Sequence, residues 1–304
     1  MQSAYSFLPQ VIAHRGSSGE APENTLASLH LAGQQGIKWV EIDVILSADG
    51  IPVIFHDDYL SRTTNSDDLI HKTSLEQLKQ LDAGSWKDPK YNKETIPTLL
   101  EAIGVISQYG MGLNLELKPC EGLEEETVAA SIDVLKQHWP KDLPLLFSSF
   151  NYFALVSAKM LWPEVARGYN VSAIPSAWQE RLDHLGCTGL HIHQSFFESK
   201  QVADIKAAGY KILAFTINDD ARALELYDQG LDAVFSDYPL KIQKALENSS
   251  AILVNSSEEA MELSNAYAPE HLILATNNAD ELAGSVVNAG SVFIGNYSCE
   301  SAGD

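Results

Sequence analysis

Acidic, imidazole and basic side chains stand at or near the ends of short apolar runs in the first 120 residues. They are His14, Arg15, Glu41, Asp43, His56, Glu116 and Lys118. Glu41 and Asp43 are two residues apart, so on a strand both side chains point to the same side. Charged groups are unfavourable against an apolar helix layer, which favours an interior, solvent-reached position for this pair.

The residue types in this set predict a particular chemistry. Three carboxylates brought together repel one another, and a hard divalent cation relieves the repulsion; oxygen ligands favour Mg²⁺, Ca²⁺ or Mn²⁺ over zinc. His14 and His56 can exchange protons near pH 7. Arg15 and Lys118 offer positive charge to a phosphate. Taken singly, each residue has an ordinary structural explanation, but four such strand ends together favour cleavage of a phosphodiester.

The elements that must position these residues alternate between β-rich runs and helix-length segments. The runs include 11–14, 39–44, 52–56, 113–117, 143–147, 166–170, 189–193 and 211–216, and 233–235 is a short extra run. This alternation over about 240 residues predicts a (β/α)8 TIM barrel with its functional residues at the strand C-termini. A doubly wound open sheet is the alternative, and the absence of a Gly-rich dinucleotide fingerprint disfavours it.

Two connections depart from this pattern. Too few residues separate Asp43 from His56 for a helix, and a turn at 48–50 lies between them, so either a hairpin or a bare loop returns the chain. The polar, turn-rich segment 57–95 follows the third run, where barrel enzymes place substrate loops. We therefore expect a small insertion after the third strand.

Composition limits the class of protein. The 304 residues are 45% hydrophobic and 20% charged, with a net charge of -21. This balance is typical of a globular protein and disfavours nucleic acid as a partner. No run approaches the roughly 20 apolar residues that span a bilayer, residues 1–10 do not resemble a secretion signal, and three scattered cysteines fit a reducing compartment. We expect a cytoplasmic protein without membrane insertion; its oligomeric state stays open.

Charge divides the chain near residue 248. Lys244 is the last basic residue, and the polar segment 247–250 follows it. We therefore place one domain at 1–248 and a second at 249–304. The shorter domain buries little apolar surface on its own.

The first domain, over about residues 9–245, resembles the glycerophosphodiester phosphodiesterases. The resemblance is carried in order by His14-Arg15-Gly16, 21–25 (APENT), 41–44 (EIDV), His56-Asp57, 60–64 (LSRTT), 115–118 (LELK) and 236–239 (SDYP). It implies a (β/α)8 barrel that hydrolyses a glycerophosphodiester to glycerol 3-phosphate and an alcohol.

The resemblance also implies roles for single residues. Glu41, Asp43 and Glu116 would hold one divalent cation, Mg²⁺ or Ca²⁺. His14 and His56 would be the general acid and base, with the assignment open. Arg15 and Lys118 would contact the phosphate. Phe215 stands where many members carry Trp and would provide an apolar wall for the glycerol.

The segment 251–304 resembles an internal piece of histidinol dehydrogenase, through 265–272 (NAYAPEHL) and 288–295 (NAGSVFIG). Glu270 and His271 would match that family's acid/base pair, and Asp304 one zinc ligand. The family's other ligands and its nicotinamide-binding regions are missing from this chain, so we expect a non-catalytic extension. The residue pattern predicts strands at 251–254 and 291–294 and helices at 258–266 and 279–288.

Two other functions compete with the main prediction. A lysophospholipase D, or a related phospholipase, on the same barrel is disfavoured because anionic lipid repels an acidic surface and because the sequence shows no apolar lip. A non-catalytic scaffold is disfavoured because the ligand and acid/base sets are complete.

Overall fold

The computed structural model describes residues 4–247, 254–269 and 271–295. The chain divides into two compact units, Met1–Asn248 and Ser249–Asp304. No helix in these described ranges has both the length and the apolarity needed to cross a membrane.

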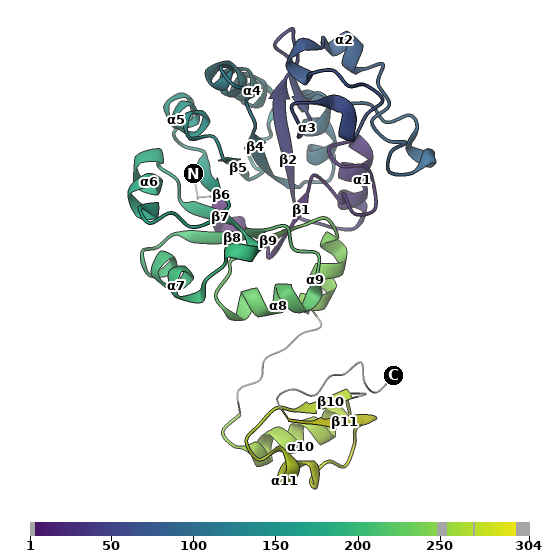
Figure 1. Ribbon diagram of the computed structural model, residues 1–304, viewed down its shortest axis with the longest axis vertical. Coiled ribbons are helices and arrows are strands. Elements are labelled where there is room, and N and C mark those ends of the chain that lie inside the picture. Colours follow the sequence, from purple (N-terminus) through teal and green to yellow (C-terminus); the bar gives the residue numbers. More distant parts are fainter. Residues whose placement is uncertain (1–3, 248–253, 270, 296–304) are drawn as a thin grey trace. The chain divides into compact units, whose positions relative to one another are not determined.

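The first unit is a closed barrel of parallel strands (Figure 1). Its strands are β1 (Val11–His14), β2 (Trp39–Leu46), β4 (Gly112–Leu117), β5 (Leu145–Ser149), β6 (Ala166–Val171), β7 (Gly189–His193), β8 (Lys211–Phe215) and β9 (Ala233–Ser236). β1 pairs in parallel with both β9 and β2, which closes the sheet. The predicted (β/α)8 TIM barrel is confirmed.

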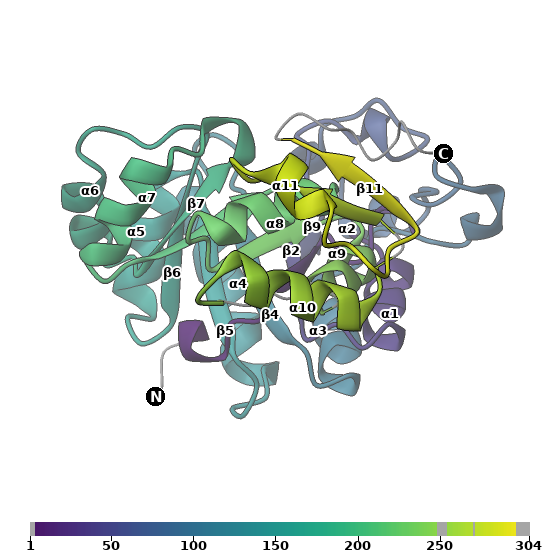
Figure 2. The same ribbon diagram turned by 90° about the horizontal axis from the view of Figure 1, so that it is seen from below.

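Helices lie outside the strands, as the two ribbon views show (Figures 1 and 2). They are α1 (Leu26–Gln34), α3 (Leu99–Gln108), α4 (Glu124–His138), α5 (Tyr152–Leu161), α6 (Trp178–Leu185), α7 (Ser199–Ala207), α8 (Asp220–Asp228) and α9 (Pro239–Glu247). Side-chain caps define several of their starts. Thr98 and Glu101 form a reciprocal capping box at the start of α3.

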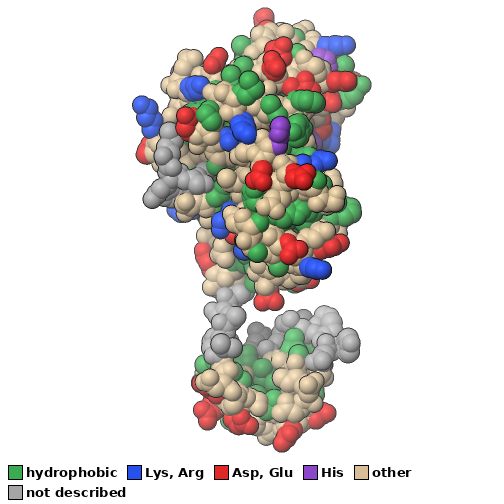
Figure 3. Space-filling view, turned by 90° about the vertical axis from the view of Figure 1, so that its left-hand side faces the viewer, with side chains coloured by type: hydrophobic (Ala, Val, Ile, Leu, Met, Phe, Trp, Pro, Cys, Tyr) green, Lys and Arg blue, Asp and Glu red, His purple; other side chains and the backbone are tan. Residues whose placement is uncertain are grey.

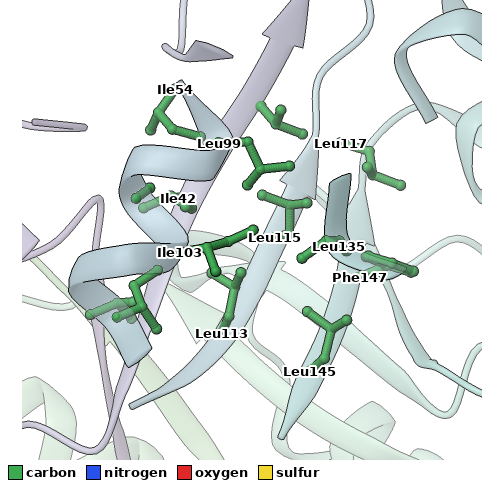
Figure 4. Close-up of a cluster of buried hydrophobic side chains, with 14 of the residues drawn as sticks. Ile42, Ile54, Leu99, Ile103, Leu113, Leu115, Leu117, Leu135, Leu145 and Phe147 are labelled. Carbon is green, nitrogen blue, oxygen red and sulfur yellow. The ribbon is translucent and has the colours of Figure 1, made fainter. Parts of the chain in front are cut away.

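Strand alternation divides each barrel strand between two environments. Ile42 on β2 and Leu113 and Leu115 on β4 pack outward against Leu99 and Ile103 of α3 (Figure 4). The residues between them, including Glu41 and Asp43, face the barrel interior because strand side chains alternate with a period of two. The outer core is therefore apolar while the interior mouth can hold charge.

The connection after β2 is a hairpin. β3 (Pro52–Ile54) runs antiparallel to β2, with Val44 opposite Ile54. The third apolar run is therefore not a barrel strand, and the short run at 233–235, treated as an extra in the sequence, supplies β9. The hairpin brings the chain back until the Phe55 N–H donates to the Asp43 carbonyl at 3.0 Å, which places His56 at the mouth.

The expected insertion follows β3 and has its own small core. It holds α2 (Leu75–Leu78) and the 3₁₀ turns Leu60–Arg62, Ile70–Lys72 and Pro89–Tyr91. Leu60, Ile70 and Leu78 are fully buried and pack with Ile96. This packing holds the segment firmly beside the barrel mouth.

The described residues of the second unit form two helices and two parallel strands: α10 (Ser257–Tyr267), β10 (His271–Leu274), α11 (Ala279–Ala283) and β11 (Ser291–Ile294). Met261, Leu274 and Ala279 form its small core. The expected helix 279–288 is wrong in length because α11 ends before Gly284, and β10 was not predicted. Of the expected strand 251–254, residues 251–253 lie outside the described residues, as do Glu270 and Asp304, and Val254 is not in a strand.

Candidate active site

Strand register brings the three proposed ligand carboxylates together. β1 and β2 pair with His14 opposite Glu41, and β2 and β4 pair with Asp43 opposite Glu116. One carboxylate oxygen from each of Glu41, Asp43 and Glu116 lies within 4.8 Å of the other two. The cluster therefore contains residues that are more than 70 positions apart in the sequence.

Burial makes this cluster electrostatically costly without a cation. Glu41 and Asp43 are 2% and 1% exposed. Burial, with the charges of Asp43 and Glu116, raises the pKa of Glu41 well above its usual range; burial and Asp43 raise the pKa of Glu116 to about 7. The buried Oε1 of Glu41 has no hydrogen-bond partner among the described residues. Three oxygen donors, one of them unpartnered, fit a hard divalent cation.

Two residues in the left-handed region of backbone space hold these carboxylates. Arg15 has φ 56° and Asn24 has φ 54°. The Arg15 backbone N–H donates to Glu41 Oε2 at 3.0 Å, and the Asn24 side chain donates to Asp43 Oδ2 at 2.8 Å. Non-glycine residues adopt this conformation at a cost of about 1–3 kcal/mol, which points to a functional constraint.

His14 is oriented by a carboxylate from the last barrel strand end. Its Nδ1 lies 2.7 Å from Asp237 Oδ1, and its Nε2 lies 4.0 Å from Glu41 Oε2. Burial tends to raise the pKa of Asp237, but hydrogen bonds from His14, Asn218 and Ser18 outweigh it and hold that pKa well below its usual value. An ionised Asp237 keeps the proton on Nδ1, so Nε2 faces the ligand cluster.

His56 sits between a carboxylate and an ammonium group. Its Nδ1 is hydrogen-bonded to Asp57, and its Nε2 lies 3.1 Å from Lys118 Nζ. Burial, together with the charges of Arg15 and Lys118, lowers the pKa of His56 against the opposing effect of Asp43. The lowered pKa favours the neutral imidazole, which is the form that can accept a proton.

A chain of ion pairs links the insertion to Arg15, one of the two candidate phosphate contacts, and to Asp57. Arg62, on the first turn of the insertion, donates two hydrogen bonds to Glu23 and one to Asp57. Glu23 also accepts from Arg15 at 2.7 Å. Arg15 thus connects through Glu23 and Arg62 to the carboxylate that orients His56.

Two cavities meet at this mouth. The smaller, about 160 Å³, is lined by His14, Arg15, Glu41 and Phe215, among others. The larger, about 510 Å³, is lined by Lys118 and by residues of the insertion. His56, Glu116 and Phe150 border both. Seven of the eight barrel residues singled out from the sequence therefore line these two cavities. The eighth, Asp43, is buried in the carboxylate cluster.

Several residues that support the site were not predicted from the sequence. Asp237, Arg62, Asn24 and Glu23 all lie within the motifs that carry the family resemblance, but none of them was given a role. Asp237 was within reach of sequence reasoning, because an acidic residue directly follows a barrel strand there. Phe150, which is 46% exposed and borders both cavities, was also not singled out as a site residue.

Metal-free stability provides a test of the carboxylate cluster. Glu41 and Glu116 have raised pKa values in the folded protein, so they ionise first in the unfolded chain as pH rises. Their effect on stability is nil below the unfolded pKa near 4.5 and becomes destabilising as pH rises towards about 7. With EDTA present, we expect the Tm of Glu116→Gln to rise relative to the Tm of the wild type between pH 5 and pH 7.5.

Because both proteins contain the same other titratable groups, the difference between their Tm values removes the contribution of those groups to the pH dependence. Mg²⁺ or Ca²⁺ is expected to raise the wild-type Tm at pH 7.5 and to leave the variant nearly unchanged. If the difference in Tm between the two proteins in EDTA does not change with pH, the raised pKa values of the carboxylate cluster are contradicted.

Comparisons with known proteins identify the first unit. The model of the glycerophosphoryl diester phosphodiesterase family matches residues 14–241. A glycerophosphodiester phosphodiesterase from Caldanaerobacter subterraneus subsp. tengcongensis is 31% identical over 235 residues, which cover 75% of this chain and 94% of the relative. The structure of an Oleispira antarctica phosphodiesterase in complex with the product sn-glycerol-3-phosphate is 84% identical, with a TM-score of 0.81, and covers 81% of this chain and 100% of that one.

The second unit matches a different family. The histidinol dehydrogenase model matches residues 213–304, beginning at β8 of the barrel rather than at residue 251. A histidinol dehydrogenase from Bacteroides fragilis is 63% identical over 62 residues, but this covers only 14% of that protein. The C-terminal segment is thus similar to a small part of that enzyme. Over most of its length, the chain belongs to the glycerophosphoryl diester phosphodiesterase family and is a phosphoric diester hydrolase.

Proposed function

We propose that this chain hydrolyses glycerophosphodiesters to glycerol 3-phosphate and an alcohol, using one divalent cation. The observation that carries the proposal is a cluster of three carboxylates, two of them buried, beside a cavity that His14 and His56 both line. Glu41, Asp43 and Glu116 would hold the cation. When bound, a divalent cation polarises a phosphoryl oxygen and offsets developing negative charge.

The protein's own residues then account for proton transfer. One histidine accepts the proton of the glycerol 2-hydroxyl as its oxygen attacks phosphorus. The bond from phosphorus to the alcohol oxygen breaks, and the other histidine gives that oxygen a proton. Water then opens the resulting cyclic phosphate with the two roles reversed, which returns both histidines to their starting states.

Positive side chains would bind the phosphate. Arg15 is 16% exposed at its side chain and already neutralises Glu23 and Asp43. Lys118 lies 3.6 Å from Glu116 and next to His56. Both cations thus flank the ligand cluster, where they can also restrain the substrate's non-bridging oxygens.

Release of glycerol 3-phosphate tests this function. Purified protein is incubated with glycerophosphocholine and with glycerophosphoglycerol, each with Mg²⁺, with Ca²⁺ or with excess EDTA. We expect product with at least one ion and loss of product with EDTA. Absence of product from both substrates with either ion would refute the proposal, and the double variant His14→Ala/His56→Ala controls for contaminating phosphodiesterases.

The second unit is proposed to be non-catalytic. Its visible surface carries acidic but no basic side chains (Figure 3), and its described residues form one small core of their own. Deleting residues 249–304 is expected to change kcat and KM for glycerophosphodiesters by less than about twofold, because the site residues all come from 14–237. A large loss of kcat in a truncated protein with an unchanged circular dichroism spectrum would contradict this.

A further inference from the structure

We propose that the larger cavity binds the alcohol arm of the substrate and favours alcohols that carry a positively charged amine. The inference rests on the proposed function, because it concerns which diester that site cleaves. The cavity, about 510 Å³, opens beside the ligand cluster and shares His56, Glu116 and Phe150 with the smaller one.

The smaller cavity suits the glycerol arm. Its volume is about 160 Å³, and Phe215 and Phe235 line it. Asn114 Oδ1, Asn170 Oδ1 and His191 Nδ1 are buried atoms of lining residues without hydrogen-bond partners among the described residues. The two amide oxygens can accept from the hydroxyl groups of a short polyol, and the imidazole nitrogen can pair with a hydroxyl group in either tautomer. The phosphate at the junction then directs the second arm into the larger cavity.

The larger cavity has an uncompensated negative charge. Asp57 is paired with Arg62 and His56, and Arg62 is paired again with Glu23. Lys118 is paired with Glu116 at the phosphate end. Asp58 differs from these groups: its carboxylate is exposed, and its side-chain contact in the described part of the chain is the Cys120 thiol at 3.5 Å.

Two exposed aromatic side chains line the same cavity as this carboxylate. Tyr59 is 58% exposed and Phe150 is 46% exposed. Phe150 is held by an edge contact with Phe215, at 5.6 Å between ring centroids. The backbone of Tyr59 forms a bridge with Leu69 of the insertion. Aromatic faces beside a carboxylate form a favourable environment for a quaternary or primary ammonium group.

An acyl chain is a poorer fit to this wall. The lining includes six charged or imidazole groups, namely His56, Asp57, Asp58, Arg62, Glu116 and Lys118. A hydrocarbon chain would desolvate them without replacing their interactions with water. An ammonium headgroup keeps Asp58 paired and leaves the existing ion pairs intact.

Substrate comparison tests the inference. kcat/KM is measured for cationic glycerophosphocholine and neutral glycerophosphoglycerol with wild type, Asp58→Asn and Tyr59→Ala, and with Asp67→Asn as the matched control. Asp67 is an exposed acid of the same insertion that lines a different cavity. We expect Asp58→Asn and Tyr59→Ala each to lower the choline-to-glycerol ratio of kcat/KM about threefold to fivefold, and their combination by roughly tenfold.

The outcomes separate this inference from the proposed function. Hydrolysis of both diesters with a ratio unchanged in Asp58→Asn, Tyr59→Ala and the double variant overturns the cationic subsite and leaves the function standing. Hydrolysis of neither diester by wild type overturns both. A ratio that also falls in Asp67→Asn assigns the preference to general surface charge and overturns the subsite. Hydrolysis of lysophosphatidylcholine that is faster than that of glycerophosphocholine, at a rate that Asp58→Asn and Tyr59→Ala leave unchanged, assigns the cavity to an acyl chain and overturns the subsite as well.

Discussion

Replacing His14 or His56 by alanine is expected to lower kcat for glycerophosphocholine by roughly two to four orders of magnitude. The reason is geometric. Both imidazoles border the same 160 Å³ cavity, and each has one nitrogen oriented by a carboxylate. The other nitrogen of His14 lies 4.0 Å from Glu41 Oε2, and that of His56 lies 3.1 Å from Lys118 Nζ. Steady-state kinetics at saturating Mg²⁺ or Ca²⁺ measures the effect.

A substrate with a better leaving group separates the two histidines. Glycerophospho-p-nitrophenol releases an anion that needs no proton, so loss of the general acid of the first step matters less for it. We expect one alanine variant to recover at least tenfold with this substrate and the other to recover little. His138→Ala, an exposed histidine at the end of α4, controls for the substitution itself. Full activity in either His14→Ala or His56→Ala would remove that residue from the mechanism.

Removing the cation is the second large effect expected. Glu41→Gln keeps the side-chain shape but removes a charge from a cluster whose oxygens lie within 4.8 Å of one another. Because a metal contributes several kcal/mol to stabilising a phosphoryl transition state, kcat/KM is expected to fall about a hundredfold or more. Excess EDTA added to the wild type is expected to have a similar effect.

Calorimetry gives a reading of this site that is independent of turnover. Titration of Mg²⁺ or Ca²⁺ into metal-depleted wild-type protein is expected to show one binding event. In Glu41→Gln, the affinity for the cation is expected to be at least tenfold lower. Glu126→Gln, an exposed substitution on α4, is the matched control. Equal cation affinity in wild type and Glu41→Gln would show that these carboxylates are not the ligands.

Local patterns in the chain were sufficient to predict the barrel. Strand and helix periodicity depends on neighbouring residues, so the alternation of short apolar runs and amphipathic segments is visible without coordinates. The same patterns do not show which of the two runs, 52–56 or 233–235, is a strand of the barrel. Whether a run joins the closed parallel sheet or folds back as a hairpin depends on pairing with distant strands, and here β9 pairs with β1 while β3 pairs with β2.

The second unit shows the same limit at smaller scale. The helix near 258–266 was predictable because its serine cap and acidic first turn are local. β10 was not, because a four-residue apolar run gains strand structure only by pairing with β11, twenty residues later. The end of α11 was also missed, since the run after Gly284 remains apolar enough to mimic a helix.

At the active site, residue types and their order could be read from the chain: paired acids on one strand, histidines next to strand ends, and cations beside them. Which of these residues meet depends on the folded barrel. Register places His14 opposite Glu41 and Asp43 opposite Glu116, and barrel closure brings Asp237 to His14 across more than 200 residues. Side-chain chemistry is local, whereas distances between strands depend on hydrogen-bond register and closure, which are properties of the whole sheet.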